Sequence, residues 1–170
     1  MSFLSEMAKT CGRSPLRSLS VSVLASLWVS TAWAGISCSV SAPGLNFGVY
    51  NYLSSPSLAI STSLSVSCTC SGSNTLSYSI SLSKGAASSY APRQMQSGTN
   101  RLDYNLYMDA AHTVVWGDGT GGSQVASASG INCKNTTYTA TPTVYGLIPP
   151  SPNVVPGNYQ DSTITVTMTY

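Results

Sequence analysis

Apolar residues alternate with serine or threonine in several stretches of this chain, and this alternation constrains its fold more than any other feature. In residues 163–170, threonine takes every odd position and an apolar residue every even one: Ile164, Val166, Met168 and Tyr170. The same period of two recurs in residues 60–68, 77–82 and 102–108. A period of two is typical of a strand with one buried face. The sequence therefore predicts an all-β domain.

Residues that favour turns gather between these stretches. Four such clusters are Pro43-Gly44 and residues 71–74, 117–119 and 156–158. Short strands separated by glycine, proline, asparagine and aspartate predict a sandwich or a barrel. Because no internal repeat and no second composition regime follows the N-terminal region, we expect a single domain over residues 35–170.

The first 34 residues have the pattern of a secretory signal peptide. Lys9, Arg13 and Arg17 form a basic region, residues 19–29 are mostly apolar, and Ala32-Trp33-Ala34 is a small-x-small cleavage sequence. The apolar stretch is too short and too rich in serine to span a bilayer. We therefore predict a signal peptide over residues 1–34 and export of the rest.

The predicted mature chain carries no net charge. Its four basic residues are balanced by four acidic ones: Lys84, Arg93, Arg101 and Lys134 against Asp103, Asp109, Asp118 and Asp161. A neutral domain lacks the electrostatic attraction that nucleic acid or an anionic membrane requires. We expect no nucleic-acid partner, and a neutral, hydroxyl-rich surface suits a component of an extracellular assembly.

The exported part contains an even number of cysteines: Cys38, Cys68, Cys70 and Cys133. In an oxidising compartment this number predicts two disulfide bonds. Cys38 and Cys68 can face each other across an antiparallel strand pair, which favours Cys38–Cys68 with Cys70–Cys133. The exchanged pairing, Cys38–Cys70 with Cys68–Cys133, remains open at this point.

Metal-binding and catalytic patterns are weak. The Cys-x-Cys spacing with Cys133 and His112 lacks the usual Cys-x-x-Cys of zinc sites. His112 and Asp109 lie among many serines, but no Gly-x-Ser-x-Gly sequence accompanies them. Residues 117–122 have neither the Gly-Lys-Ser/Thr of a phosphate loop nor enough carboxylates for calcium. We predict no metal, no cofactor and no enzymatic activity.

Seven short sequences, in order, resemble the spore coat U domain family over nearly the whole predicted mature chain. They are Cys38 with Leu45-Asn46-Phe47-Gly48-Val49-Tyr50, Val66-Ser67-Cys68-Thr69, Arg93-Gln94-Met95, Leu102-Asp103-Tyr104-Asn105-Leu106-Tyr107, Val115-Trp116-Gly117-Asp118-Gly119-Thr120, Tyr145-Gly146-Leu147-Ile148-Pro149 and Gly157-Asn158-Tyr159-Gln160-Asp161-Ser162. The family takes its name from a spore coat protein. It also contains subunits of archaic chaperone–usher pili, which mediate adhesion and biofilm formation.

The resemblance implies an incomplete immunoglobulin-like β-sandwich that lacks its last strand. In such subunits a periplasmic chaperone fills the resulting groove by strand addition, and a donor strand from another subunit replaces it at an outer-membrane usher. The resemblance then places the groove along the apolar face of the last strand: Ile164, Val166, Met168 and Tyr170. The alternative is an ordinary strand of a complete sandwich.

The predicted cleavage leaves only Gly35, Ile36 and Ser37 before Cys38. A donor segment needs about ten residues, because a strand rises only about 3.3 Å per residue. We therefore expect a subunit that accepts a strand without donating one, at the tip of a pilus on the cell surface. The alternative function is a coat or extracellular matrix protein.

Aromatic residues next to turns form a further hypothesis: Tyr50, Tyr52, Tyr90, Tyr107, Trp116 and Tyr159. If exposed in loops, they offer apolar contacts to an abiotic or glycan surface. The competing interpretation is that most of them close the ends of the core, because large aromatic side chains are usually highly buried.

Overall fold

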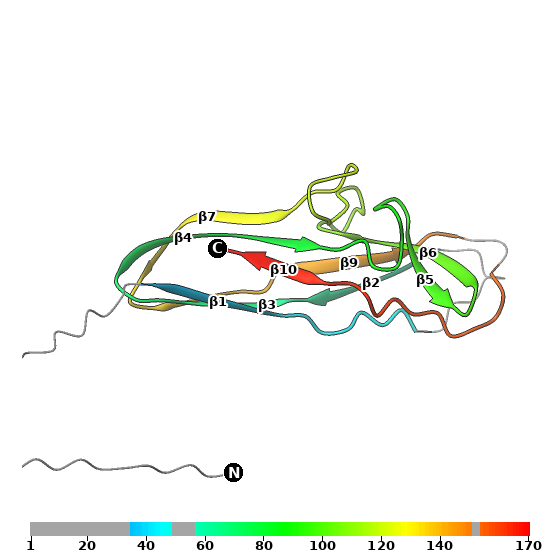
Figure 1. Cartoon of the computed structure of the whole chain (residues 1–170), viewed down its shortest axis with the longest axis horizontal. Helices are drawn as coiled ribbons and strands as arrows, with labels where there is room; N and C mark the ends of the chain where they lie inside the picture. The colour runs from blue at the N-terminus through cyan, green and yellow to red at the C-terminus, as the bar shows by residue number, and fades with distance from the viewer. Residues whose placement is uncertain (1–34, 49–56, 151–153) are drawn as a thin grey trace, which may run out of the picture. The chain divides into compact units, whose positions relative to one another are not determined.

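The computed structural model describes residues 35–48, 57–150 and 154–170, and the predicted signal peptide lies outside them (Figure 1). The described residues form strands and no helices: β1 (Ile36–Ser41), β2 (Leu58–Ser63), β3 (Ser65–Cys70), β4 (Ser73–Leu82), β5 (Arg93–Ser97), β6 (Asn100–Tyr107), β7 (Ala126–Lys134), β8 (Thr137–Ala140), β9 (Thr143–Ile148) and β10 (Val166–Thr169). A search of the same residues for helices long and apolar enough to cross a membrane finds none.

The strands form three antiparallel sheets, with the orders β1-β3-β8, β10-β4-β7 and β2-β9-β6-β5. The first and third sheets continue each other, because β2 and β3 are separated only by Leu64, and β8 and β9 only by residues 141–142. The Leu64 amide donates to the Pro142 carbonyl at 2.9 Å, so pairing persists across the break. The predicted all-β sandwich is confirmed.

The alternation seen in the sequence becomes an inner and an outer face. In β3, the serine and threonine positions are exposed, whereas Val66, Cys68 and Cys70 are buried. The core joins these residues to Leu76, Ile80 and Leu82 of β4 and to apolar residues of β6 and β9. Burial of each such side chain contributes about 1.5–3 kcal/mol.

Two disulfide bonds fix the first strands. Cys38 is bonded to Cys68 in the neighbouring strand, with 4.0 Å between their Cα atoms. Cys70 is bonded to Cys133, with 5.7 Å between Cα atoms, which joins β3 to β7. The structure thus has the first of the two pairings considered above.

The aromatic residues proposed as surface contacts are mostly internal where the structure describes them. Trp116 is 1% exposed, and its indole Nε1 donates to the Ile80 carbonyl at 2.8 Å. Tyr90 is 2% exposed and donates to the Leu82 carbonyl. Tyr107 and Tyr159 are half-buried. Tyr50 and Tyr52 lie outside the described residues.

A candidate strand-acceptor cleft

β1 and β10 each end a sheet, because β1 pairs only with β3 and β10 only with β4. Cα atoms of the two strands come within 8 Å of each other, yet no ladder joins them among the described residues. Each strand therefore presents an unpaired backbone edge along the same border of the sandwich. We call this part of the border the narrow half.

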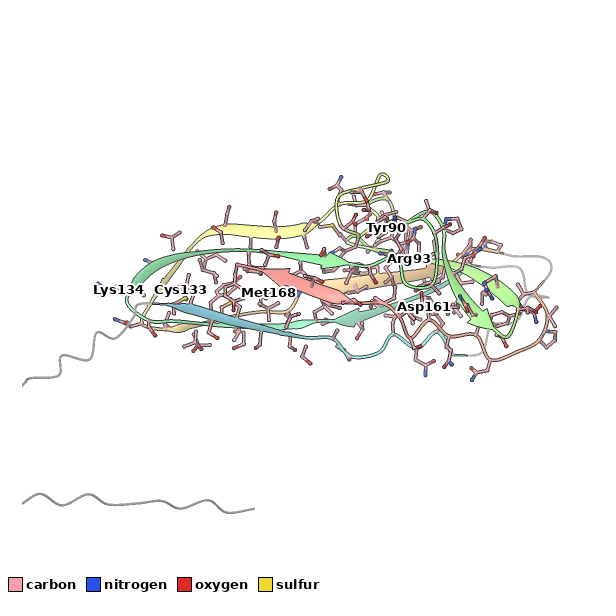
Figure 2. The ribbon with its side chains drawn as sticks, viewed as in Figure 1. Tyr90, Arg93, Cys133, Lys134, Asp161 and Met168 are labelled. Carbon is pink, nitrogen blue, oxygen red and sulfur yellow. A yellow bond between two sulfur atoms is a disulfide. The ribbon has the colours of Figure 1, made fainter. Side chains whose placement is uncertain are left out.

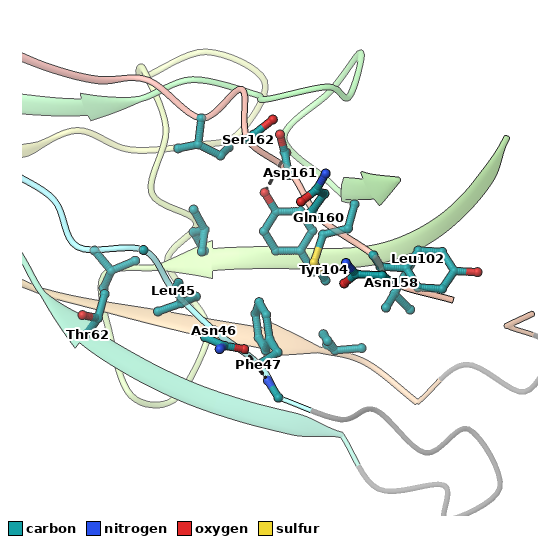
Figure 3. Close-up of a pocket in the computed structure, with 18 of the residues that line it drawn as sticks. Leu45, Asn46, Phe47, Thr62, Leu102, Tyr104, Asn158, Gln160, Asp161 and Ser162 are labelled. Atoms are coloured by element: carbon teal, nitrogen blue, oxygen red, sulfur yellow. Dashed lines mark hydrogen bonds between the residues drawn. The ribbon is translucent and has the colours of Figure 1, made fainter. Parts of the chain in front are cut away.

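Beyond these strands the border opens into a cleft of about 800 Å³ (Figure 3). One side is the segment after β1, residues 42–48, and the other is residues 154–165, which lead into β10 and are called the wall segment below. The floor consists of core side chains: Leu64, Leu82, Leu102, Leu106, Val144 and Ile148. The cleft therefore gives access to the apolar core from outside.

Leu45 and Phe47 hold residues 42–48 against the floor. Both side chains lie over Gly146 of β9, where an added Cβ would stand only 2.8 Å from the Phe47 ring and closer still to Leu45. The Phe47 ring also meets Tyr104 edge to face, with 6.0 Å between centroids. The two side chains take the space that a Cβ at position 146 would occupy, so a larger residue there would displace them.

The apolar face predicted for the last strand divides into two groups. Ile164 and Val166 line the cleft, and Met168 is half-buried against the core. Tyr170, by contrast, is 56% exposed. It lies one residue beyond the last pair of the β10–β4 ladder, Thr169 with Ser79, so the burial expected from its place in the alternation does not occur.

A buried arginine is paired with the cleft residue Tyr104 in the β5–β6 ladder. Arg93, at the start of β5, is 0% exposed, and burial lowers its pKa. Its guanidinium donates to the Ser83 carbonyl at 3.0 Å, the Asn105 side-chain oxygen at 2.7 Å and the Trp116 carbonyl at 2.6 Å. Arginine stays charged even when buried. These contacts tie three chain segments to the start of β5.

Tyr104 and Asp161 link this buried group to the wall segment. The Tyr104 hydroxyl donates to Asp161 at 2.8 Å. Burial, followed by this hydrogen bond, raises the pKa of Tyr104, so the phenol keeps its proton. Figure 2 shows Tyr90, Arg93 and Asp161 in the same part of the sandwich, with Cys133 toward the other end of the strands.

Sequence analysis named Arg93 and Asp161 as charged residues and as parts of the seven family-like short sequences, called tags below, without placing them together. Arg93, Asn105 and Asp161 belong to three different tags, yet in the structure Arg93 binds Asn105, and Tyr104, the residue before Asn105, binds Asp161. The available signal was the rarity of charge. A chain with so few charged residues gives each of them a specific reason to be examined.

The residues considered for catalysis or metal binding have other partners. The Asp109 carboxylate accepts from the Val114 amide at 2.7 Å and from Thr113, and these hydrogen bonds lower its pKa. The His112 ring meets the rings of Tyr107 and Tyr145 edge-on, at 5.2 and 6.4 Å between centroids. The four cysteines of the described region are consumed in disulfides.

Comparison with solved structures finds a similar fold in the chaperone–tip adhesion subunit pre-assembly complex CsuC–CsuE, from the archaic chaperone–usher Csu pili of Acinetobacter baumannii. The sequence identity is 23% and the TM-score 0.50. The match covers 79% of this chain but only 40% of that chain. No curated protein matches this sequence significantly.

The family comparison is more extensive. The model of the Spore Coat Protein U domain matches residues 23–168. This match includes all ten strands except the last residue of β10, and all seven tags. It begins inside the predicted signal peptide, so the boundary at Ala34 remains a prediction. By the extent of this match, the chain belongs to the spore coat protein U domain family.

Proposed function

We propose that this protein is an exported structural subunit of an archaic chaperone–usher pilus, in which the cleft accepts a β-strand from a partner. The observation that supports this most is the border between β1 and β10. Two unpaired strand edges lie along this border, and beyond them the border opens into the apolar core. Strand addition uses both features, because backbone hydrogen bonds supply affinity and alternate side chains fill the apolar space.

The geometry indicates how a strand would fit. An inserted strand needs about 9.6 Å between its neighbours, which is twice the usual spacing of about 4.8 Å. The narrow half, where Cα atoms of β1 and β10 come within 8 Å, must therefore widen, whereas the cleft is already open. Each large apolar side chain that enters contributes about 1.5–3 kcal/mol.

The partners follow from this role. An open groove with unpaired edges is an aggregation hazard, so a periplasmic chaperone is expected to cover it after export. A donor strand from another subunit then replaces the chaperone at an outer-membrane usher, and the product reaches the cell surface. The role is structural and requires no cofactor.

Within such a pilus we favour the tip, with surface adhesion and biofilm formation as the outcome. Two considerations support this. The structurally similar complex contains a tip adhesion subunit. Cleavage at the predicted site would also leave a segment too short to donate a strand. A glycan or an abiotic surface is the expected target.

The family name keeps a second function in view, since it refers to a spore coat protein. As a coat or matrix component, the same sandwich would pack without a chaperone and usher. Periplasmic co-purification separates the two, because only the pilus subunit should be isolated with a chaperone in equal amounts.

The direct test is co-expression of the full chain with a periplasmic chaperone of an archaic chaperone–usher system, followed by affinity purification. We expect a one-to-one complex that Val166→Asp abolishes, because Val166 lines the cleft and a buried unpaired charge costs several kcal/mol (about 3 or more). Thr167→Asp, on the exposed face of the same strand, is the matched control and should retain the complex. Equal loss from both variants would contradict a one-sided groove.

A further inference from the structure

The wall segment has few backbone ties to the rest of the sandwich. Among the described residues its backbone forms one bridge, in which Gln160 and Gln96 exchange hydrogen bonds of 2.9 and 3.1 Å. Near β10, Ser83 contacts the wall segment. Its hydroxyl donates to the Thr163 carbonyl and accepts from the Thr165 amide, and its own amide donates to the Thr165 carbonyl. Between these two points, side chains must determine where the wall lies.

Asp161 occupies the interval and contacts three different parts of the chain. Its Oδ2 accepts from the Tyr104 hydroxyl at 2.8 Å and from the Ala86 amide at 3.4 Å. Its Oδ1 accepts from the amide and hydroxyl of Thr163, at 3.1 and 2.7 Å. Figure 3 shows the Tyr104 hydroxyl pointing from the cleft floor toward Asp161. One carboxylate thus joins β6, the β4–β5 loop and the wall segment.

The surroundings of this carboxylate are shaped to receive it. Gly85 has a φ of +66°, and a Cβ at that position would overlap the Asp161 carboxylate. The fully buried Arg93 is a nearby positive charge, and its attraction to the Asp161 carboxylate favours the charged form of the arginine. A loop glycine and a buried phenol therefore meet at a single acidic side chain, with a buried cation as a long-range attraction.

We propose that Asp161 is the positioning residue of the acceptor cleft: it pins the wall segment to Tyr104 and the β4–β5 loop, so that the cleft is open before a strand arrives. The inference rests on the proposed strand-acceptor function. Its consequence is that Asp161 contributes to partner affinity by pre-organisation, because a wall already in place costs no ordering at the moment of binding.

The first test measures the wall without any partner. Hydrogen exchange of the full chain should show faster exchange for amides of residues 160–166 in Asp161→Ala, with the β2–β9 ladder unchanged. Asp103→Asn is the control. Asp103 is an acidic residue of β6, next to Tyr104, but its carboxylate binds Gln94 and not the wall segment. Unchanged exchange in Asp161→Ala would overturn the proposal, whether or not the protein is a pilus subunit.

The second test measures binding, with a synthetic twelve-residue peptide of alternating valine and threonine as the probe. We expect Asp161→Ala to weaken its binding about tenfold, the scale of losing charge-assisted hydrogen bonds. Tyr104→Phe removes the same link from the other end and keeps the core filled. In a double-mutant cycle, Asp161→Asn should therefore add little to Tyr104→Phe.

The outcomes separate the two ideas. If the wild type binds the peptide and both Asp161→Ala and Tyr104→Phe bind it equally strongly, the role of Asp161 is refuted. The proposed function is then unaffected. A different result is that the wild type fails to bind the peptide while Asp161→Ala still speeds hydrogen exchange in the wall segment. That result would refute the acceptor function and support the contact that holds the wall. Additive losses from Tyr104→Phe and Asp161→Asn would show that the two residues act separately, which also contradicts the proposal.

Discussion

The two halves of the border between β1 and β10, the narrow half and the open half that contains the cleft, are held in place by different contacts. In the narrow half, β1 and β10 are regular strands whose positions are set by backbone ladders with β3 and β4 and by the Cys38–Cys68 bond. In the open half, residues 42–48 and 154–165 have almost no ladder, and side chains position them. Leu45 and Phe47 do so on one side, and Asp161 on the other.

This difference matters for the proposed strand-acceptor function. Backbone ladders leave a strand edge straight and regular, which a partner can extend by hydrogen bonding. Side-chain contacts allow two chain segments to stand apart over an apolar floor without collapsing onto it. We therefore expect changes in the narrow half to act mainly through strand position, and changes in the open half through the shape of the cleft.

The largest expected effect comes from the disulfides. Removing either bond should cost about 2–5 kcal/mol of the free energy of unfolding. The bonds close sequence separations of 30 and 63 residues, so loss of Cys70–Cys133 should cost about 0.7 kcal/mol more in chain entropy. Urea unfolding of the double-alanine variants measures both.

The same two variants test the comparison through binding. Cys38–Cys68 holds β1 at the border, whereas Cys70–Cys133 joins β3 to β7 away from it. Removing Cys38–Cys68 should therefore change strand acceptance more, although it changes stability less. If the variant that loses more unfolding free energy also loses more affinity for a strand-donating partner, then the position of β1 does not determine strand acceptance in the narrow half.

Much of the fold was predictable because alternation depends on local sequence. The stretches 60–68, 77–82, 102–108 and 163–170 all contribute to strands. The predicted lengths were less accurate. Leu64 interrupts the first stretch, and only Val166–Thr169 of the last one joins a ladder. The interruption has a physical reason, because the paired strand also breaks at residues 141–142.

The open half could not be predicted in this way. Arg93 is a charged residue, and charged residues are expected to be exposed when only the sequence is known. Its burial depends on two backbone carbonyls and an asparagine that come from other parts of the chain. Asp161 likewise has no local pattern that indicates contact with Tyr104, 57 residues earlier. Such contacts exist only once the strands are assembled.

A smaller effect is expected from the floor of the open half. Gly146→Val places side-chain atoms where Leu45 and Phe47 lie, so it should destabilise the protein by about 1–3 kcal/mol and displace residues 42–48. Gly44→Ala is the control in the same region, because no other heavy atom lies within 4 Å of its added Cβ. It should stay within about 0.5 kcal/mol of the wild type. Equal effects would show that Leu45 and Phe47 do not position this segment.

The smallest expected effect is on the pH dependence of the free energy of unfolding. It compares a tyrosine in the cleft with a tyrosine near the narrow half. Tyr104 lies in the cleft, and Tyr78 lies in β4 next to the last β10–β4 pair, and both have a raised pKa. Burial, with a further contribution from Tyr138, raises the pKa of Tyr78 from 10.0 to about 12. A raised pKa stabilises the fold while the unfolded phenol is still protonated, so this contribution is complete below pH 10 and is lost as the pH rises toward 12.

We therefore expect the free energy of unfolding to fall between pH 10 and 12 and the fall to be shallower in Tyr78→Phe and in Tyr104→Phe. Tyr104→Phe should also loosen the wall segment at neutral pH, because it removes the link to Asp161, whereas Tyr78→Phe should not. Denaturant unfolding across this pH range, read together with hydrogen exchange at pH 7, checks both. If both variants loosen the wall at neutral pH, the two halves are not held independently.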